Sequence, residues 1–371
     1  MMKAIRFFAW PIFAGILVGL SVLWWYEAGP GATSARLAGP FGGRIDSYAD
    51  AVSKAAPAVV NIYTTQVVEH EELSSDPLFD RFVERPRRER LLSSLGSGVL
   101  VSSKGYILTS NHVIQGGDEI IASLADGREA VANVVGTDPE TDLALLQIDL
   151  DNLPVVRLAS AGPVRVGDVA LAIGNPLGVG SSVSMGIVSA TGRSHLGIAT
   201  FENFIQTDAA ISRGNSGGAL IDTRGNLIGI NTAILSSDGT WQGIGFATPA
   251  SVAQEVMTDL IAYGRVIRGW LGVTVQDITP NLASTFGLEE VRGGLVSEVL
   301  RDSPAFTGGL RPGDVLVGVN GDTIRDGYEA MNIIAGTKPG STLELNVIRN
   351  HDKMDITVEI GTRPPATTSD R

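Results

Sequence analysis

The chain has 371 residues, enough for two or three domains, and carries a net charge of −12 at pH 7. This acidic balance argues against a nucleic-acid-binding protein, because such a protein needs a basic surface. There is no cysteine, which excludes disulfides, thiolate metal sites and cysteine nucleophiles without fixing the compartment.

The N-terminal segment predicts a membrane anchor. Residues 7–26 carry no charge, follow Lys3 and Arg6, and end in three aromatic residues. A helix of this length spans the roughly 30 Å hydrocarbon core and places its aromatic end at the interface. A cleaved signal peptide is the alternative, but the apolar run is long and no clear A-x-A site follows it. We therefore expect residues 1–6 in the cytoplasm and the chain after residue 26 to be exported.

The next part of the chain predicts a tether followed by a β-rich domain. Residues 27–45 are rich in Gly, Ala, Pro and Ser, which is typical of a linker. Residues 46–261 contain many short Val/Ile/Leu runs separated by turn signals, a number that suits two β-barrels. A charged surface loop over residues 69–93 interrupts these strands. Residues 249–264 show the apolar spacing of a helix.

The C-terminal part predicts a second, smaller domain. Residues 262–362 mix short strands with two helices. Residues 363–371 read as a disordered tail.

Ser216 lies among small residues in the motif Gly-Asn-Ser-Gly-Gly. One interpretation is a tight turn between buried strands, because glycine reaches backbone angles that other residues avoid. The other is a serine nucleophile, since an attacked carbonyl must approach the hydroxyl and its oxygen must reach backbone N–H groups. The motif alone leaves both open, and a nearby base and acid would favour the nucleophile.

Four histidines could supply that base. His70 lies in the charged loop and His351 in a predicted hairpin turn, and both are most simply solvated surface residues. His195 is expected on a loop. His112 follows the apolar run Tyr-Ile-Leu-Thr-Ser, at the start of a loop or short helix. Taken in isolation, His112 is more simply a hydrogen-bonded structural histidine than a catalytic base.

The acidic segment over residues 138–142 supplies the third group. Asp142 is the last polar residue before a predicted buried strand, so its carboxylate can point inward, where it would orient an imidazole and stabilise its cation. The D-x-E-x-D spacing also resembles a calcium loop, but Leu143 replaces the turn glycine and no Glu closes the loop. The chain order His112, Asp142, Ser216 is that of chymotrypsin-class serine proteases.

The segments "YILTSNHVI", "TDLALL", "AIGNPLG" and "TDAAISRGNSGG" resemble the HtrA (high-temperature-requirement) family of serine proteases, and the resemblance covers residues 48–362. It implies a mostly β fold, a trypsin/chymotrypsin-like double six-stranded β-barrel followed by one α+β PDZ domain. A single PDZ domain, an N-terminal anchor and a short loop resemble the DegS-type branch. The soluble chaperone-protease branch usually has two PDZ domains.

The resemblance implies a role for each matching residue. His112 would be the general base, Asp142 would orient it, and Ser216 would attack the substrate. The N–H groups of Gly214 and Ser216 would form the oxyanion hole.

Further positions matter for regulation. Arg193 matches the family's sensor-loop arginine, although a solvated loop charge is the simpler alternative. Ser212 and Ser110 stand where the family commonly has Asn, and the first of these departures leaves the activation contacts less certain.

The segment "RGWLGV" resembles the carboxylate-binding loop of a PDZ domain, and "GYEAMNIIAG" the facing helix. Backbone N–H groups of residues 271–273 would hold a C-terminal carboxylate while the peptide adds to the sheet edge. Ordinary core packing is the alternative for the helix residues. The expected peptide-binding residues are Trp270, Leu271, Gly272, Val273, Tyr328 and Met331.

The resemblance implies a serine endopeptidase of the envelope stress response, with no cofactor and no metal. It would be a single-pass inner-membrane protein with its catalytic and PDZ domains in the periplasm, and a homotrimer. C-terminal peptides of misfolded outer-membrane proteins would activate it, and a transmembrane anti-sigma factor would be its substrate.

Two other functions stay open. One is a general periplasmic quality-control protease and chaperone that degrades unfolded proteins. The other is a non-enzymatic PDZ adaptor with a silent barrel, which a complete His112, Asp142 and Ser216 set disfavours.

Overall fold

The computed structural model describes most of the chain beyond the N-terminal region. The described residues are 47–68, 90–159, 162–175, 180–234, 243–288 and 290–364. Within these ranges no helix has the length and apolar character needed to cross a membrane. The expected anchor at 7–26, the expected tether and His70 lie outside the described residues.

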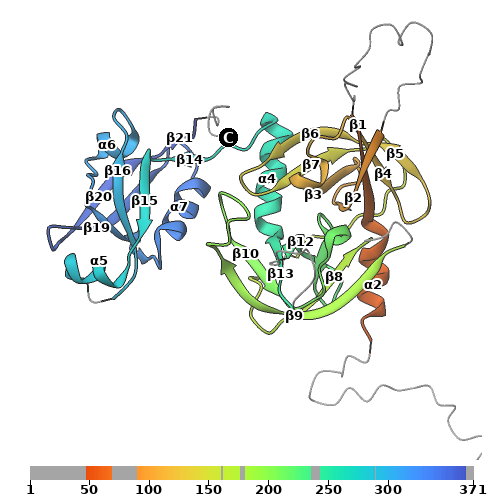
Figure 1. The fold of residues 1–371 in the computed structure, drawn as a ribbon, viewed down its shortest axis with the longest axis horizontal. Coiled ribbons are helices and arrows are strands. Elements are labelled where there is room, and N and C mark those ends of the chain that lie inside the picture. The colour runs from red at the N-terminus through yellow and green to blue at the C-terminus, as the bar shows by residue number, and fades with distance from the viewer. Residues whose placement is uncertain are drawn as a thin grey trace, which may run out of the picture. The chain divides into compact units, whose positions relative to one another are not determined.

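The first half of the protease region is an antiparallel sheet of seven strands in the order β5-β4-β1-β2-β3-β7-β6 (Figure 1). The strands are β1 (Val59–Val68), β2 (Arg90–Leu100), β3 (Tyr106–Ser110), β4 (Glu119–Ser123), β5 (Glu129–Val131), β6 (Asn133–Asp138) and β7 (Leu143–Gln147). We expected six strands, and the seventh is the short β5, which pairs with the outer edge of β4. The expected loop at 69–93 also ends early, because β2 starts at Arg90 opposite Val68.

The second half is a closed barrel of six strands, as expected, in the order β10-β13-β12-β11-β8-β9. Its strands are β8 (Val169–Gly174), β9 (Ser182–Arg193), β10 (Phe204–Thr207), β11 (Ala219–Ile221), β12 (Leu227–Ile234) and β13 (Gly245–Pro249). Small and branched residues such as Ala170, Ala172, Val188 and Leu220 fill its interior and are fully buried. A six-stranded barrel leaves room only for side chains of this size.

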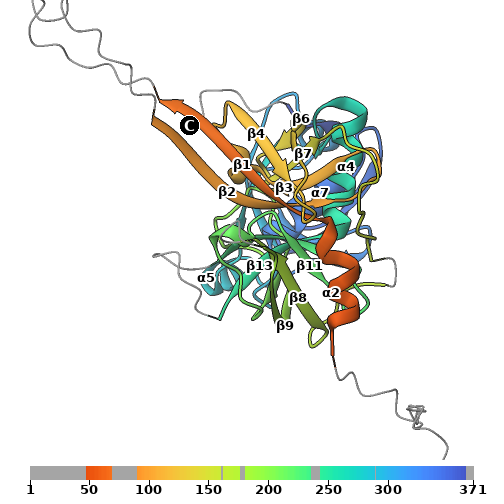
Figure 2. The ribbon, with the colours of Figure 1, turned by 90° about the vertical axis from the view of Figure 1, so that its right-hand side faces the viewer.

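Two helices flank these sheets (Figure 2). Helix α2 (Ala49–Ala55) leads through a short 3₁₀ turn, η1 (Ala56–Ala58), into β1. Helix α4 (Ala250–Tyr263) confirms the predicted helix and packs against β6, β7, β12 and β13, so it contacts both sheets. Gly264 ends α4 with a positive φ of 67°. The expected domain boundary after residue 261 therefore falls inside a helix, because the apolar face of α4 belongs to the protease core.

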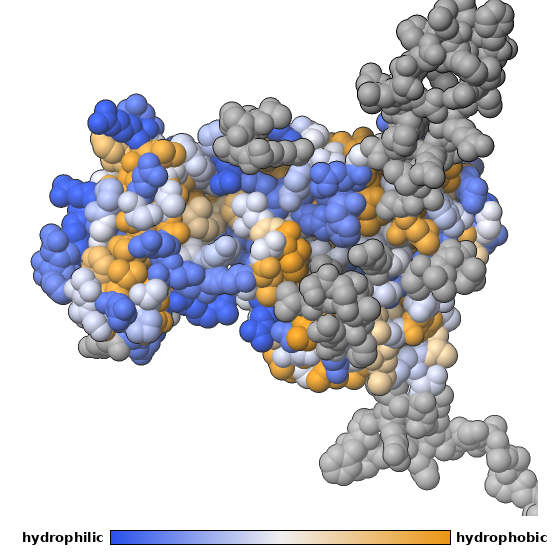
Figure 3. Space-filling view, in the orientation of Figure 1, coloured by the Kyte–Doolittle hydropathy of each residue, from blue (hydrophilic) through white to orange (hydrophobic). Residues whose placement is uncertain are grey.

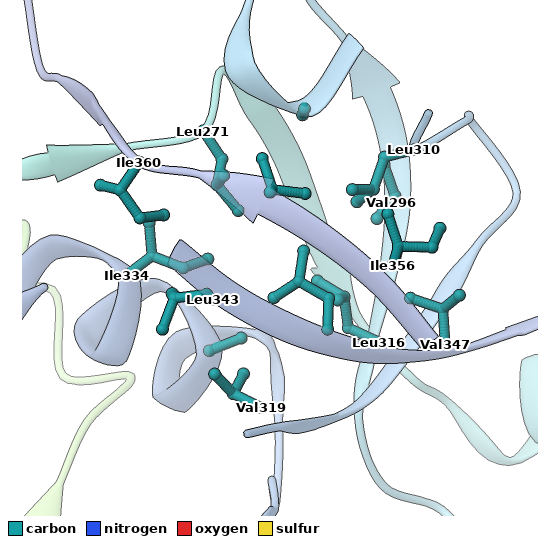
Figure 4. Packing of buried hydrophobic residues seen from close by; sticks show 14 of the residues in the cluster. Leu271, Val296, Leu310, Leu316, Val319, Ile334, Leu343, Val347, Ile356 and Ile360 are labelled. Carbon is teal, nitrogen blue, oxygen red and sulfur yellow. The ribbon is translucent and has the colours of Figure 1, made fainter. Parts of the chain in front are cut away.

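The C-terminal domain is a small sheet closed by helices. Its elements are β14 (Gly269–Trp270), β15 (Val273–Asp277), α5 (Pro280–Thr285), β16 (Gly294–Val299), α6 (Pro304–Gly308), β17 (Val315–Val319), β18 (Asp322–Thr323), α7 (Gly327–Gly336), β19 (Thr342–Arg349), β20 (Asp352–Glu359) and β21 (Gly361–Thr362). The main strand path is β15-β16-β17-β19-β20, which leaves β15 on an edge. Leu316, Leu343 and Ile334 meet between the sheet and α7 (Figure 4).

Candidate active site

His112 and Asp142 are brought together by strand pairing. His112 lies in the one-turn helix α3 (Asn111–Ile114) directly after β3, and Asp142 directly precedes β7. Strands β3 and β7 pair with Ser110 opposite Leu143. This pairing brings His112 and Asp142 next to each other, although they are 30 positions apart in sequence. The Nδ1 atom of His112 lies 2.6 Å from Asp142 Oδ2. An Nδ1–H donated to the carboxylate leaves Nε2 as the free acceptor that a general base needs.

Asp142 is held by more than this one contact. Its Oδ1 accepts a hydrogen bond from the His112 backbone N–H at 2.9 Å, and its own carbonyl accepts the Asn111 N–H at 3.0 Å. The backbone of Asp142 has a positive φ of 57°, a conformation that non-glycine residues adopt rarely and that is frequent at functional sites. The carboxylate is nearly buried. It is thus fixed in place and shielded from water.

The glycines around Ser216 are explained by close packing against neighbouring strands, of the first sheet for Gly217 and of the barrel itself for Gly218. Gly217 has a φ of 80°, and a Cβ there would lie 2.1 Å from Ser97 O and 2.3 Å from Thr109 Oγ1. A Cβ on Gly218 would lie 2.3 Å from Ile173 O. The tight-turn interpretation is therefore correct for these glycines. It does not compete with the nucleophile interpretation, because the same turn also fixes Ser216, whose carbonyl accepts the Ser97 N–H of β2.

The turn before Ser216 is fastened to the first sheet. It forms a 3₁₀ turn, η2 (Arg213–Asn215), in which Asn215 N–H donates to Ser212 O. The Ser97 hydroxyl donates to Gly214 O at 2.7 Å, and Ser97 N–H donates to Ser216 O at 2.8 Å. Ser97 therefore links strand β2 to both residues expected to form the oxyanion hole.

Ser110, one of the two departures from the family pattern, is fully buried and donates to Asn231 O at 3.4 Å.

The Ser216 hydroxyl and the His112 ring, both within the described residues, make no hydrogen bond to each other. Contacts between a nucleophile and its base are often long in the free enzyme and close when substrate binds. His112 remains about half exposed, so its Nε2 is accessible from solvent.

Arg193 is the last residue of β9 and binds within its own barrel. Its Nε donates to Gln206 Oε1 on β10 at 2.8 Å. Strand β10 continues through residues 208–212 into the turn η2, which carries the expected oxyanion residues. The position is compatible with a sensor, but the contact with the PDZ domain comes from a different residue of the same segment.

The expected carboxylate loop of the C-terminal domain has a defined orientation. Leu271 O accepts the Ala305 N–H and Gly272 O accepts the Leu300 N–H, both at 2.9 Å. In a trans peptide the N–H points opposite to the carbonyl, so the N–H groups of Gly272 and Val273 face away from those partners. Gly272 has a φ of 74°, and a Cβ there would lie 2.4 Å from Ser303 Cβ.

Strand β15 and helix α7 form the sides of the expected peptide groove. As an edge strand β15 offers backbone groups for an added strand. Hydrophobic surface gathers over β15 and β16 between hydrophilic margins (Figure 3). On α7, Ala330 and Ile334 enter the core, while Met331 is half-buried against it and Tyr328 is 39% exposed. Leu271 is buried in the core and Trp270 pairs in β14 with β21, so these two expected residues contribute backbone and support.

Two arginines fasten the ends of the C-terminal domain to the segment that carries Asp142. Arg268 forms a buried fork with Asp138, with Nη1–Oδ1 at 2.9 Å and Nη2–Oδ2 at 2.5 Å, and also reaches Glu140. Arg363 pairs with Glu140 at 2.9 Å, and both guanidinium groups lie over the Phe201 ring. Two of the three acids of the calcium-like spacing, Asp138 and Glu140, are therefore occupied by arginines. Arg363, assigned to the disordered tail from sequence, is ordered because these contacts hold it.

The segment between β9 and β10 also contacts the C-terminal domain, and sequence reasoning missed this. His195 packs on Tyr328 with ring centroids 4.3 Å apart, and Asn332 Nδ2 donates to Glu202 O at 2.8 Å. The buried Glu202 carboxylate accepts three backbone N–H groups, from residues 196, 198 and 199, which fixes the segment. No sequence motif marks Glu202, and only its position before β10 could have suggested a buried role.

Comparison with known protein families gives two matches. The family described as "Trypsin-like peptidase domain" matches residues 96–230. The family described as "PDZ domain" matches residues 269–360. These ranges contain the His112, Asp142 and Ser216 arrangement and the strand β15 and helix α7 of the expected groove, respectively.

Relatives and solved structures agree with these matches. A probable periplasmic serine endoprotease, DegP-like, from Pseudomonas putida is 43% identical over 332 residues, covering 84% of this chain and 69% of the relative. The corresponding protein of Hahella chejuensis is 43% identical over 326 residues, with coverage of 84% and 69%. The HtrA-type protease AlgW, solved with a decapeptide, is 54% identical with a TM-score of 0.73, covering 86% of this chain and 100% of that structure. The serine endoprotease of Yersinia pestis is 40% identical with a TM-score of 0.61, covering 86% and 98%.

Proposed function

Since this chain belongs to the HtrA-type serine proteases, a family of trypsin-like endoproteases, and carries a single PDZ domain, we propose that it is a peptide-regulated enzyme. In this proposal, C-terminal peptides of misfolded outer-membrane proteins bind the β15–α7 groove and activate cleavage of a transmembrane anti-sigma factor. The main support for this regulation is that α7 contacts the segment between β9 and β10, through Tyr328 and Asn332.

The catalytic step would use the arrangement around Ser216. Ser216 Oγ attacks the scissile carbonyl, and His112 Nε2 takes the hydroxyl proton and later gives it to the leaving amine. Asp142 orients the imidazole and stabilises the imidazolium. The N–H groups of Gly214 and Ser216 stabilise the oxyanion, each contributing about 10²–10³ in rate. The support is the 2.6 Å His112–Asp142 contact and the hydrogen bond that the Ser216 carbonyl accepts from the Ser97 N–H of β2.

Peptide recognition would follow the strand-addition mode. The edge position of β15 and the outward N–H groups of Gly272 and Val273 support a peptide that extends the sheet and ends with its carboxylate in the loop. Tyr328 and Met331 would contact its side chains. The AlgW structures with a tripeptide and a decapeptide are consistent with this mode in a 54% identical protein.

Coupling between the groove and the active site has a short physical route. Phe201 N–H donates to Glu140 O at 2.9 Å, which ties the segment between β9 and β10 to the segment that carries Asp142. Arg193 and Gln206 connect the end of β9 to β10 and hence to η2. A peptide that displaces Tyr328 or α7 would act on both routes. Such coupling requires two states with different peptide affinity.

The location and assembly complete the proposal. We propose a single-pass inner-membrane anchor at residues 7–26, periplasmic protease and PDZ domains that are divided after α4, and a homotrimer. The uncharged N-terminal run supports the anchor, and the names of the relatives support the periplasm.

The test follows cleavage of an anti-sigma periplasmic domain by the full chain in detergent. A decapeptide ending in Phe is added as the free acid or, as the matched control, as the C-terminal amide. We expect strong stimulation by the acid, little by the amide, and no cleavage by Ser216→Ala. Equal rates with and without either peptide would refute regulation while leaving the protease intact.

General quality control is the second candidate, favoured by the 43% identity to DegP-like proteases. It predicts rapid degradation of an unfolded protein such as reduced casein without any peptide. A narrow substrate range that depends on the free-acid peptide would exclude it.

A further inference from the structure

Three side chains outside the active site converge at the end of the PDZ groove. His195 Nε2 lies 3.4 Å from Asp277 Oδ2 and 3.9 Å from Asp326 Oδ2. All three of these atoms lie within 4.8 Å of one another. His195 follows β9, Asp277 ends β15, and Asp326 directly precedes α7, so three separate segments meet here.

The two carboxylates are held in a similar way. Asp277 Oδ1 accepts the Gly327 N–H at 3.1 Å, and Asp326 Oδ1 accepts the Glu329 N–H at 2.8 Å as the N-cap of α7. In each residue one oxygen is thus fixed by the backbone, and the other, Oδ2, is directed toward His195. Ligand orientation by hydrogen bonds of this kind is a usual feature of metal sites.

The position of His195 is also fixed by its neighbours. Its ring packs on Tyr328, and the next residue, Leu196, donates its N–H to the buried Glu202 carboxylate at 2.7 Å. Its backbone has a positive φ of 65°, which is uncommon for residues other than glycine. These contacts set the ring on the groove side with Nε2 toward the acids.

We infer that His195, Asp277 and Asp326 form a binding site for a Zn²⁺ ion that links the protease to the PDZ domain. Zinc takes nitrogen and oxygen ligands at about 2.0–2.2 Å in a tetrahedron, which places neighbouring ligand atoms roughly 3.4 Å apart. The 3.4 Å and 3.9 Å separations are close to that value. Water supplies the fourth ligand, because His195 and Asp277 are partly exposed. Calcium and magnesium prefer oxygen ligands alone, so the histidine disfavours them.

A metal ion bound between His195 and the two carboxylates accounts for this arrangement better than a hydrogen bond from the His195 ring does. Both separations exceed the usual 2.7–3.2 Å of an N–H···O hydrogen bond, and one N–H cannot satisfy two carboxylates. The nearby Arg325 is engaged by Glu329 through its backbone and side chain, at 2.7 Å and 3.1 Å. The three carboxylates of this corner therefore outnumber its one guanidinium, which leaves a negative site for a cation.

The ion would act on the regulated element. It would join the segment between β9 and β10 to both sides of the groove at the end remote from the carboxylate loop. Any change in peptide affinity on metal binding must be matched by an equal change in metal affinity. Metal binding itself does not depend on the proposed peptide activation.

The test is titration of the full chain, purified without chelator and carried on a tag free of histidine, with ZnCl₂ in a calorimeter. We expect one site with a Kd below about 100 μM. His195→Gln, Asp277→Asn and Asp326→Asn should each weaken binding at least tenfold. The asparagines retain the oxygen that accepts the backbone N–H, so folding is preserved. His351→Gln, an exposed histidine elsewhere in the PDZ domain, is the matched control and should bind as the parent does.

Co²⁺ distinguishes this site from the only other His–Asp pair in contact within the described residues, His112–Asp142. Tetrahedral Co²⁺ at the proposed site should give visible absorption that persists in His112→Gln and disappears in His195→Gln. Absence of Zn²⁺ binding below about 100 μM, or unchanged binding in His195→Gln, would overturn the inference.

Discussion

The junction around Ser216 and the boundary with the PDZ domain are built in opposite ways. At the junction, backbone meets backbone: a Cβ on Gly217 or Gly218 would lie within 2.3 Å of a carbonyl oxygen of a neighbouring strand. At the boundary, polar side chains reach across: Arg268 to Asp138, Arg363 to Glu140, and His195 toward two acids.

This difference bears on what each region can do. Close-packed backbone has few alternative arrangements, which suits a site whose atoms must be held to within a fraction of an ångström. Ion pairs and ring contacts can be exchanged for others at modest cost, which suits a contact that must change when a peptide binds. Substitutions in the two regions should therefore differ in kind and not only in size.

The largest effect is expected at the junction from Asp142→Asn. The amide would favour the wrong imidazole tautomer, and in serine proteases of this class the equivalent change lowers kcat by about 10⁴-fold. Peptide-stimulated cleavage should fall by that factor with an unchanged melting temperature. Asp168→Asn, a change of a partly exposed acid that directly precedes β8 of the second barrel, should retain full activity. A loss smaller than tenfold for Asp142→Asn would contradict the assigned role.

At the boundary, Arg268→Ala should give the largest loss of stability. It leaves the buried Asp138 carboxylate without its fork partner, and breaking a buried pair in this way costs about 3–5 kcal/mol. Chemical denaturation of the full chain measures the change. Arg292→Ala removes a pair whose members are both about half exposed or more, so it should change the free energy of unfolding by less than about 1 kcal/mol. Equal effects of the two variants would show that burial does not matter here.

Gly217→Ala tests whether the junction is as tightly packed as described. The positive φ alone costs about 1–2 kcal/mol, and overpacking adds about 1–3 kcal/mol. Gly167→Ala is the matched control, because Gly167 also has a positive φ but nothing lies within 4 Å of its added Cβ. The melting temperature should fall distinctly further for Gly217→Ala. Similar losses would mean that backbone strain, and not the neighbouring strands, requires glycine.

Sequence predicted the junction better than the boundary, for a physical reason. Ser216, His112 and Asp142 each lie close in sequence to a regular apolar strand. The pattern of that strand indicates where each residue lies in the fold. The antiparallel pairing of β3 and β7 then accounts for the contact between two of them. The number of strands in the first sheet was missed because β5 has only three residues, too few to give an alternating pattern.

The boundary could not be derived in this way. Arg268 and Asp138 are 130 positions apart, and neither lies in a motif that names the other. His195 was assigned to a loop, which is correct, but a loop residue discloses nothing about the surface it faces. The family resemblance points to Arg193 as the sensor, but Arg193 binds Gln206 within its own barrel. The sequence does not show which distant residue a single charged residue pairs with. That pairing follows only from the folded arrangement.

The smallest effect is expected from Glu329→Gln, beside the boundary. Burial alone would raise the pKa of Glu329, but hydrogen bonds from the Arg325 N–H and guanidinium outweigh it and hold the pKa below its ordinary value. A lowered folded-state pKa contributes stability above the unfolded value of about 4.3 and loses it as the pH falls through the folded value. An i,i+4 pair that is this exposed contributes about 0.3–0.5 kcal/mol. Glutamine still accepts the Arg325 N–H, so the variant removes the charge alone.

Denaturation of parent and variant at pH 7 and again near pH 3 should therefore show a small difference that closes in acid. A difference that persists at pH 3 would assign the effect to packing of the side chain. A loss at pH 7 comparable to that of Arg268→Ala would erase the distinction between the buried and exposed ion pairs of the boundary. The exposed pair would then have to be regarded as a structural support of α7, and the easily exchanged contacts of the boundary would be confined to His195 and Tyr328.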